Sequence, residues 1–249
     1  MNNEIIINKS FSSKQEREEA DIKKIKEISE EIMNDRLNRL FPLRFKKVKT
    51  SDIPESVNEK LKSLNEKGLY LFGSVGTGKT HLGYSILRKI IEDDYSNAIV
   101  SVDKEYADYK IKRDEEMKKL GTDELVRKNF MVFNPAVRKI TRCALSNFAK
   151  MLQIIKNSYD EDSQQISAED FNNDILIIDD LGVEKFTDWS IENLYQLVDM
   201  RYKKMLPTIF ISNLSLKDLS SKVGDRITSR IAEMSEIIRF AGKDRRLEK

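Results

Sequence analysis

One stretch of the sequence decides the fold: Gly73-Ser74-Val75-Gly76-Thr77-Gly78-Lys79-Thr80, which fits the pattern G-x-x-x-x-G-K-[ST]. It follows the apolar run 69–72, which is predicted as a strand, and it leads into a helical pattern from residue 79 to about residue 92. The glycines let successive backbone N–H groups point at a polyphosphate, and the N-terminus of the helix adds the positive end of its dipole. The sequence therefore predicts a phosphate-binding loop between a strand and a helix.

The two residues that close this loop carry its chemistry. Lys79 is expected to contact the β- and γ-phosphates of ATP or GTP, and the Thr80 hydroxyl is expected to bind Mg²⁺. An ordinary glycine turn is the alternative, but it leaves the predicted strand before the loop and the helix after it unexplained.

A second apolar run ends in two acids: Ile175-Leu176-Ile177-Ile178-Asp179-Asp180. Four aliphatic residues without polar alternation predict a central strand of a parallel sheet. Asp179 is expected to hold Mg²⁺, and Asp180 to orient or polarise the attacking water. The alternative is that one of these carboxylates only caps or solvates the end of the strand.

Weaker signals lie towards the C-terminus. Further strands are predicted at residues 98–102 and 208–212, and Asn213 follows the second of them. Its carboxamide could contact the γ-phosphate or the attacking water, although asparagine after a strand is usually a turn residue. Arg226 and Arg230 are four residues apart and share one face of a predicted helix, which by itself indicates only a solvated surface.

The N-terminal part of the chain has a different pattern. From about residue 15 to residue 40 it is rich in Glu and Lys and contains no Gly or Pro. Its apolar residues recur at steps of three and four, which is typical of an amphipathic helix, and Phe41-Pro42 ends it. We therefore divide the chain into a helical, partner-binding segment at residues 1–40 and a main domain at residues 41–249.

Composition excludes several other classes of protein. The 44 basic and 42 acidic residues give a net charge of only +2, so nucleic-acid binding would have to come from local patches. One cysteine, Cys143, and one histidine, His81, exclude an internal disulfide and the usual Cys/His zinc sites. No apolar run is long enough to cross a membrane, and the N-terminus lacks a secretory signal. We expect a cytoplasmic protein with no zinc and no membrane partner.

From about residue 41 onward the chain resembles the AAA+ ATPases of the clade that contains the DnaC- and DnaI-type helicase loaders and the IstB transposition helpers. The stretches that carry the resemblance are FPLRF, LFGSVGTGKTHL, ILIIDDLGVEKFTDWSIENLYQLVDMRY, PTIFISNLS and GDRITSRIAEM. It implies a P-loop NTPase of the α/β class, with a parallel sheet flanked by helices and a minimal C-terminal lid, since only 36 residues (249 minus 213) follow Asn213.

The resemblance also implies roles for single residues. Asp179 and Asp180 correspond to the Walker B acids, and Asn213 to sensor 1. Arg230 corresponds to an arginine finger that acts on ATP held by a neighbouring subunit, so that hydrolysis requires self-association. Arg246, in preference to Arg245, corresponds to sensor 2.

Two further assignments come from the resemblance. His81, directly after Thr80, falls among the nucleotide-binding residues, although its place inside the helix favours a structural role. A helical element expected at residues 146–159 would line a pore, with Lys150 and Lys156 contacting single-stranded DNA. Packing of that helix with solvated lysines is an equally good interpretation.

The leading hypothesis is an ATP-hydrolysing loader of a hexameric replicative helicase, which binds single-stranded DNA and docks through its N-terminal helix. Hydrolysis of ATP to ADP and phosphate would be slow, because Asp180 is shorter than the glutamate common in AAA+ proteins. Alternatives are an IstB-like ATPase that assists a transposase and a scaffold that scarcely hydrolyses its ATP. A small-molecule kinase is disfavoured because it explains neither Asn213 nor the match around Walker B. The charged stretch 103–139 receives no role.

Overall fold

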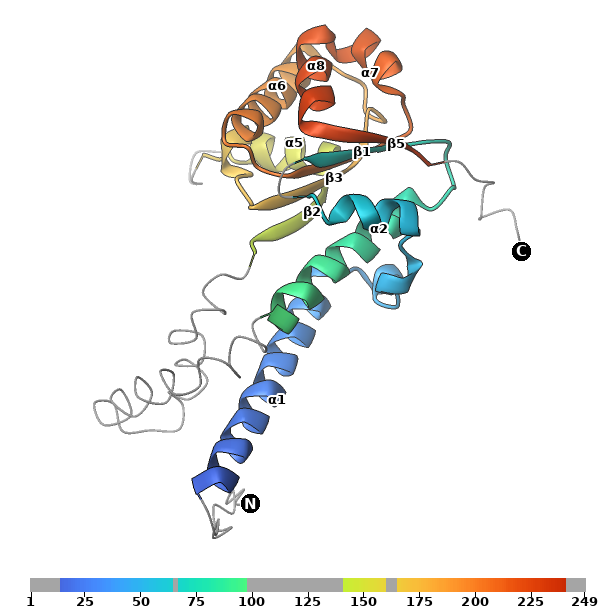
Figure 1. Ribbon diagram of the computed structural model, residues 1–249. Helices are drawn as coiled ribbons and strands as arrows, with labels where there is room; N and C mark the ends of the chain where they lie inside the picture. Colours follow the sequence, from blue (N-terminus) through green and yellow to red (C-terminus); the bar gives the residue numbers. More distant parts are fainter. Residues whose placement is uncertain (1–13, 65–66, 98–140, 160–164, 241–249) are drawn as a thin grey trace. The chain divides into compact units, whose positions relative to one another are not determined.

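The computed structural model describes residues 14–64, 67–97, 141–159 and 165–240 (Figure 1). The chain divides into two compact units: Met1–Asn38 with Glu92–Ile140, and Arg39–Ile91 with Thr141–Lys249. The predicted strand at 98–102, the charged stretch 103–139 and the two arginines Arg245 and Arg246 lie outside the described residues.

The second unit contains one sheet of five parallel strands in the order β2-β3-β4-β1-β5. Its strands are β1 (Gly68–Phe72), β2 (Cys143–Asn147), β3 (Ile175–Leu181), β4 (Thr208–Ser212) and β5 (Ser235–Arg239). Helices connect successive strands, as parallel pairing requires: α5 (Phe148–Asn157), α6 (Asp188–Lys203), α7 (Leu216–Val223) and α8 (Asp225–Met234). The predicted α/β class is confirmed.

Both faces of this sheet are covered. Figure 1 shows α5, α6 and α8 on one face and α2 (Glu55–Leu61) on the other. On the first face Leu176 and Ile178 of β3 belong to a buried cluster that includes side chains of α5, α6 and α8. On the second face Gly83, in the helix of residues 79–97, packs against Ile177 and Ile211. Successive residues of β3 are thus buried on opposite faces, which explains its run of four aliphatic residues.

Side chains cap the N-termini of two helices. Thr187 precedes α6, and its Oγ1 accepts a hydrogen bond from the backbone N–H of Ser190. Ser215 caps α7 in the same way through the N–H of Asp218, and Gly224 ends that helix. These contacts satisfy N–H groups that have no partner within the helix.

Two strands were not predicted, and one predicted helix began too early. β2 and β5 form the two edges of the sheet. The helix expected from Ser146 begins instead at Phe148, because Asn147 is its N-cap and accepts a hydrogen bond from the N–H of Ala149 (2.9 Å). Ser146 lies in β2, as does Cys143, which is buried.

The N-terminal helix is present as predicted: α1 spans Lys14–Leu40 and ends where Phe41-Pro42 follows. The helix after the phosphate loop extends to residue 97, beyond its predicted end. Short 3₁₀ turns are η1 (Leu43–Phe45), η2 (Thr50–Asp52) and η4 (Ala168–Asp170). Within the ranges that the structure describes, none of the helices combines the length and apolar character needed to cross a membrane.

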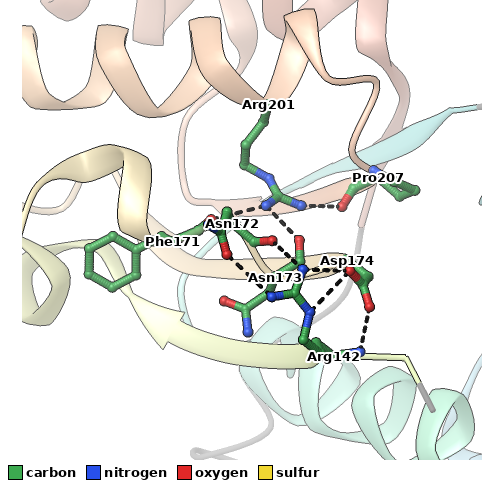
Figure 2. A network of polar contacts seen from close by, with 7 residues as sticks. All are labelled: Arg142, Phe171, Asn172, Asn173, Asp174, Arg201 and Pro207. Atoms are coloured by element: carbon green, nitrogen blue, oxygen red, sulfur yellow. Dashed lines mark hydrogen bonds and ion pairs between the residues drawn. The ribbon is translucent and has the colours of Figure 1, made fainter. Parts of the chain in front are cut away.

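A fully buried arginine fixes the starts of two central strands (Figure 2). Arg201 of α6 donates hydrogen bonds to Thr208 Oγ1 (2.7 Å) and to the carbonyls of Phe171 (3.1 Å), Asn173 (2.9 Å) and Pro207 (2.8 Å). These acceptors lie just before β3 and at the start of β4. The guanidinium therefore ties the loop that leads into β3 to the strand beside it.

Candidate nucleotide site

The sheet brings the predicted site residues to one edge. In the register of the sheet, Phe72 of β1 pairs with Ser212 of β4, and Ser212 also pairs with Leu181 of β3. The phosphate loop follows Phe72, Asn213 follows Ser212, and the N–H of Gly73 donates to the Ser212 carbonyl (3.3 Å). The loop, the two acids of β3 and Asn213 therefore meet at the carboxyl edge of the sheet, where ligands of parallel α/β sheets bind.

The loop has the backbone conformation that its glycines permit. Gly76 and Gly78 have φ values of +79° and +97°, a region that residues with a side chain rarely adopt. Between them, the buried hydroxyl of Thr77 donates to the Ser74 carbonyl (3.0 Å) and closes the loop on itself. The loop is held in one shape by its own residues, in front of the N-terminus of the helix 79–97.

Lys79 lies beneath the loop that it follows. Its side chain is buried, and Nζ donates to the carbonyls of Gly73 (2.7 Å) and Ser74 (2.6 Å). These contacts hold a positive charge at the centre of the loop, where it would meet the phosphates of a bound nucleotide. Both the loop shape and this buried charge fit a polyphosphate.

Asp179 and Thr80 are neighbours, as expected of two ligands of one ion. The Asp179 carboxylate is buried, makes a hydrogen bond with the Thr80 side chain and accepts one from the Asp180 N–H (2.9 Å). Burial, with the nearby charge of Asp180, raises the pKa of Asp179 to about 6, against the opposing effects of Thr80 and Lys79. A divalent cation at this point would favour the ionised form of Asp179. Mg²⁺ ordinarily binds only one or two protein oxygens, together with phosphates and waters. The Thr80 hydroxyl and the Asp179 carboxylate therefore fit Mg²⁺.

Asp180 occupies an irregular point of its strand. Its φ is +55°, and the register between β3 and β4 shifts here, since Ile178 pairs with Phe210 but Leu181 pairs with Ser212. β3 thus has one residue more than β4 in this interval, which is a β-bulge. The bulge changes the direction of the side chains around Asp180 at the edge where the phosphate loop lies.

Asn147 is a site residue that the sequence analysis missed. Its Nδ2 donates to Asp180 Oδ2 (3.1 Å), while its Oδ1 caps α5. An asparagine before a helical run is a recognisable cap signal, but nothing in the local sequence points to a carboxylate 33 residues away. Asn147 positions Asp180 from the adjacent strand β2.

Two predicted residues contact other parts of the unit. His81 Nε2 lies 2.9 Å from Asp52 Oδ2 of η2. Arg230 lies on α8, which is followed directly by Ser235 of β5. Ser235 pairs with Gly68 at the start of β1, whereas the phosphate loop follows the opposite end of β1. The structure therefore does not bring Arg230 to the phosphate loop of its own chain; its guanidinium contacts α6 instead.

Two comparisons of the sequence show which known proteins this chain is similar to. The family model described as "IstB-like ATP binding protein" matches residues 128–249, which contain β3, Asn213 and Arg230 but not the phosphate loop. The replicative helicase loader DnaI of Bacillus subtilis (strain 168) is 28% identical over 213 residues, which cover 77% of this chain and 53% of the relative. The chain is thus similar to the AAA+ clade that contains DnaC, DnaI and IstB. It spans about half the length of this curated relative.

Solved structures show the same AAA+ fold. A crystal structure of DnaI has a TM-score of 0.51 at 18% identity and covers 82% of this chain and 94% of the other. A crystal structure of the DnaC helicase loader has a TM-score of 0.50 at 22% identity and covers 80% of this chain and 99% of the other. The predicted P-loop architecture is thus confirmed at the level of the fold.

Proposed function

We propose that this chain is a cytoplasmic, ATP-hydrolysing loader of a hexameric replicative helicase. The observation that carries the proposal is the meeting of the phosphate loop, Asp179, Asp180 and Asn213 at one edge of the sheet. The similarity to DnaI supports the loader role. The cofactors are ATP and Mg²⁺, and the reaction yields ADP and phosphate.

In this proposal each residue has a separate task. The loop N–H groups and Lys79 bind the phosphates, and Thr80 and Asp179 hold Mg²⁺, which would neutralise charge that develops on the phosphates. Asp180, positioned by Asn147, orients the attacking water. Asn213 contacts the γ-phosphate or that water, and Arg246 contacts the nucleotide as sensor 2. Arg230 of a neighbouring subunit completes the site.

The proposed partners are the helicase and single-stranded DNA. The segment at residues 1–40, most of which is the helix α1, would dock on the helicase. On α5, Lys150 and Lys156 are exposed, while Phe148, Met151 and Ile155 are buried. The packing interpretation and the DNA-contact interpretation of this helix are therefore compatible, and we propose that both hold.

The deciding experiment mixes the full chain with the replicative helicase of its host in ATP and Mg²⁺ and measures the mass of the eluted species by size-exclusion chromatography with light scattering. A loader should co-elute with the helicase as a defined complex. Separate elution would contradict the loader role. The double variant Glu19→Lys with Glu27→Lys should weaken the complex, because both side chains are exposed on α1. Glu169→Lys with Glu192→Lys, the same charge change elsewhere, is the matched control and should not.

An IstB-like role in transposition is the second candidate, and the family model that matches residues 128–249 favours it. It predicts binding and bending of duplex DNA and a complex with a transposase. Electrophoretic mobility shifts with duplex and single-stranded DNA of equal length separate the two roles. Preference for the duplex would favour the transposition role.

A scaffold with structural ATP makes a different prediction. Lys79→Ala would then abolish assembly, whereas Asp180→Asn and Arg230→Ala would leave function unchanged. Loss of function in the last two variants, with ATP binding retained, would support hydrolysis as the working step.

A further inference from the structure

Arg230 is held by a set of residues on the neighbouring helix α6, which we call the Arg230 cradle: Tyr195, Asp199 and Tyr202. Arg230 Nη2 lies 2.9 Å from Asp199 Oδ1. The guanidinium carbon lies 5.1 Å from the centre of the Tyr195 ring and 5.7 Å from that of Tyr202. The three cradle residues are four and three positions apart on α6, so they share one helix face.

The cradle fixes the arginine without using up its donors. Arg230 presents one terminal nitrogen to Asp199, and within the described ranges Nε and Nη1 have no hydrogen-bond or ion-pair partner. An arginine has five N–H donors in a planar fork, which matches a phosphate. The arginine side chain is 22% exposed and so can still be reached from outside.

The charges around the cradle leave a cationic surface. Lys203 Nζ lies 2.7 Å from Asp199 Oδ2, and Arg226 is stacked on Tyr195 with its guanidinium carbon 4.4 Å from the ring centre. The carboxylate of Asp199 thus faces three cations, Lys203, Arg226 and Arg230, which together hold its pKa below the usual value. A second carboxylate, Glu233, accepts a hydrogen bond from Tyr202 (2.9 Å), so three cations face two acids around the cradle. The excess positive charge favours an anionic group from outside this chain.

We propose that Asp199 is a positioning residue that orients Arg230 towards the ATP phosphates bound by a second copy of this chain. The proposal rests on the proposed function, in which Arg230 acts on the neighbouring subunit. Asp199 holds one end of the guanidinium by an ion pair, and the tyrosine rings support its face. Because the side chain is already ordered before subunits meet, the transition state gains its contact without a further loss of side-chain freedom.

The test uses mixed assemblies, in which the finger and the site belong to different chains. Arg230→Ala has an intact site but no finger, and Asp180→Asn has an intact finger but an inactive site. Each variant alone should be almost inactive in ATP and Mg²⁺. Their equimolar mixture should recover activity at about a quarter of its sites, because each subunit gives a finger to one neighbour and receives one from the other.

Asp199→Asn is then placed in one chain at a time. On the Asp180→Asn chain, which donates the finger, it should lower kcat of the mixture about 10- to 100-fold and leave KM unchanged. On the Arg230→Ala chain, which only offers its site, it should have no effect. A merely structural role of Asp199 would give equal losses in the two arrangements and would overturn the proposal.

The control on the same helix is Glu192→Gln, an exposed carboxylate changed in the same way, which should be neutral on either chain. Light scattering checks that all mixtures assemble alike. A mixture of Arg230→Ala and Asp180→Asn that recovers no activity would overturn the role of Arg230 between subunits, and the role of Asp199 with it. If the mixture recovers the same activity with and without Asp199→Asn on the finger-donating chain, the role of Asp199 alone is overturned.

Discussion

At the scale of the single residue, Asp179 shows a conflict between stability and function. Its carboxylate is buried beside a second acid, which raises its pKa to about 6. In the unfolded chain an aspartate titrates near its model value of 3.8, so the folded state without a cation binds protons more tightly than the unfolded state. Above the folded pKa the ionised carboxylate therefore lowers the stability of the folded protein when no cation is bound.

We therefore predict that Asp179→Asn stabilises the nucleotide-free protein at neutral pH while it abolishes hydrolysis. The gain in the free energy of unfolding should be on the order of 2–3 kcal/mol at pH of about 7.5 and smaller at pH of about 5, because the penalty grows as pH rises from the unfolded to the folded pKa. Urea unfolding of both proteins without Mg²⁺ measures it. Glu169→Gln, an exposed acid, should show no such gain. A gain that does not grow with pH would contradict the assignment to this carboxylate.

Asn147 performs two tasks with the two atoms of its amide, and they can be separated. Its oxygen caps α5, and its nitrogen donates to Asp180. Asn147→Ser keeps a good N-cap but loses the longer contact, so stability should change by less than about 0.5 kcal/mol. Hydrolysis should fall about tenfold, the value of one hydrogen bond to a charged group. Steady-state ATPase assays and thermal unfolding test the two halves of this prediction.

The comparison variant is Asn147→Ala, which loses both contacts and should also cost about 1 kcal/mol of stability. Full ATPase activity in Asn147→Ser would show that Asp180 does not depend on its neighbour.

At the scale of the element, the two arginines in Figure 2 bind the same loop from different environments. Arg201 is fully buried, and burial lowers the pKa of its guanidinium to about 10, so it stays charged at neutral pH. Arg142 pairs with Asp174 (2.9 Å) from an exposed position, with 64% of its side chain accessible. Arg201 donates to a hydroxyl and buried carbonyls, whereas Arg142 forms an exposed ion pair, so the two arginines should contribute very differently to stability.

We predict that Arg201→Leu lowers the free energy of unfolding by about 3–5 kcal/mol, because several buried carbonyls lose their donors. Arg142→Leu should cost about 1 kcal/mol or less, as expected for an exposed pair. Urea denaturation of the two variants gives both values. Arg201→Lys should recover only part of the loss, because one ammonium cannot match the planar fork. Equal costs at the two positions would refute this account of the strand starts.

The elements also show what the sequence could and could not predict. β1, β3 and β4 were found because their apolar residues are buried on both faces, which leaves a continuous run. β2 and β5 are edge strands with half-buried or exposed positions such as Ile237, so they have no such run. The motif predicts the residues of the phosphate loop but gives only one reason for a glycine at position 73. The structure adds another, because a Cβ at Gly73 would lie 2.0 Å from the Phe240 carbonyl oxygen.

Contacts between distant segments account for the remaining differences. The bulge at Asp180 depends on the pairing of β3 with β4, and the contact from Asn147 depends on the pairing of β2 with β3. The family resemblance supplied Arg230, but its contacts with Asp199 and the tyrosines join α8 to α6. Such pairings are properties of the folded sheet and leave no local periodicity.

At the scale of the whole molecule, charge limits how DNA can be bound. With 44 basic and 42 acidic residues, the chain has no general field that would attract a polyanion. The proposed binding to single-stranded DNA would then depend on a few cations at fixed positions, repeated in each subunit of the proposed assembly. Lys150 and Lys156, exposed on α5 above a buried apolar stripe, are the cations we assign to this task.

The double variant Lys150→Ala with Lys156→Ala should therefore weaken binding to single-stranded DNA and reduce its dependence on salt. Each lost phosphate contact lowers the slope of log K against log salt by about 0.7, so two contacts lower it by about 1.4 per subunit. Fluorescence anisotropy with a labelled oligothymidine, in ATP and at several salt concentrations, measures the slope. Lys204→Ala with Lys217→Ala removes the same charge from other exposed positions. If the two double variants reduce the slope equally, binding follows net charge and α5 has no special part in it. If only the α5 variant does, the cations that contact DNA belong to the helix that follows β2, the strand that also holds Asp180 through Asn147.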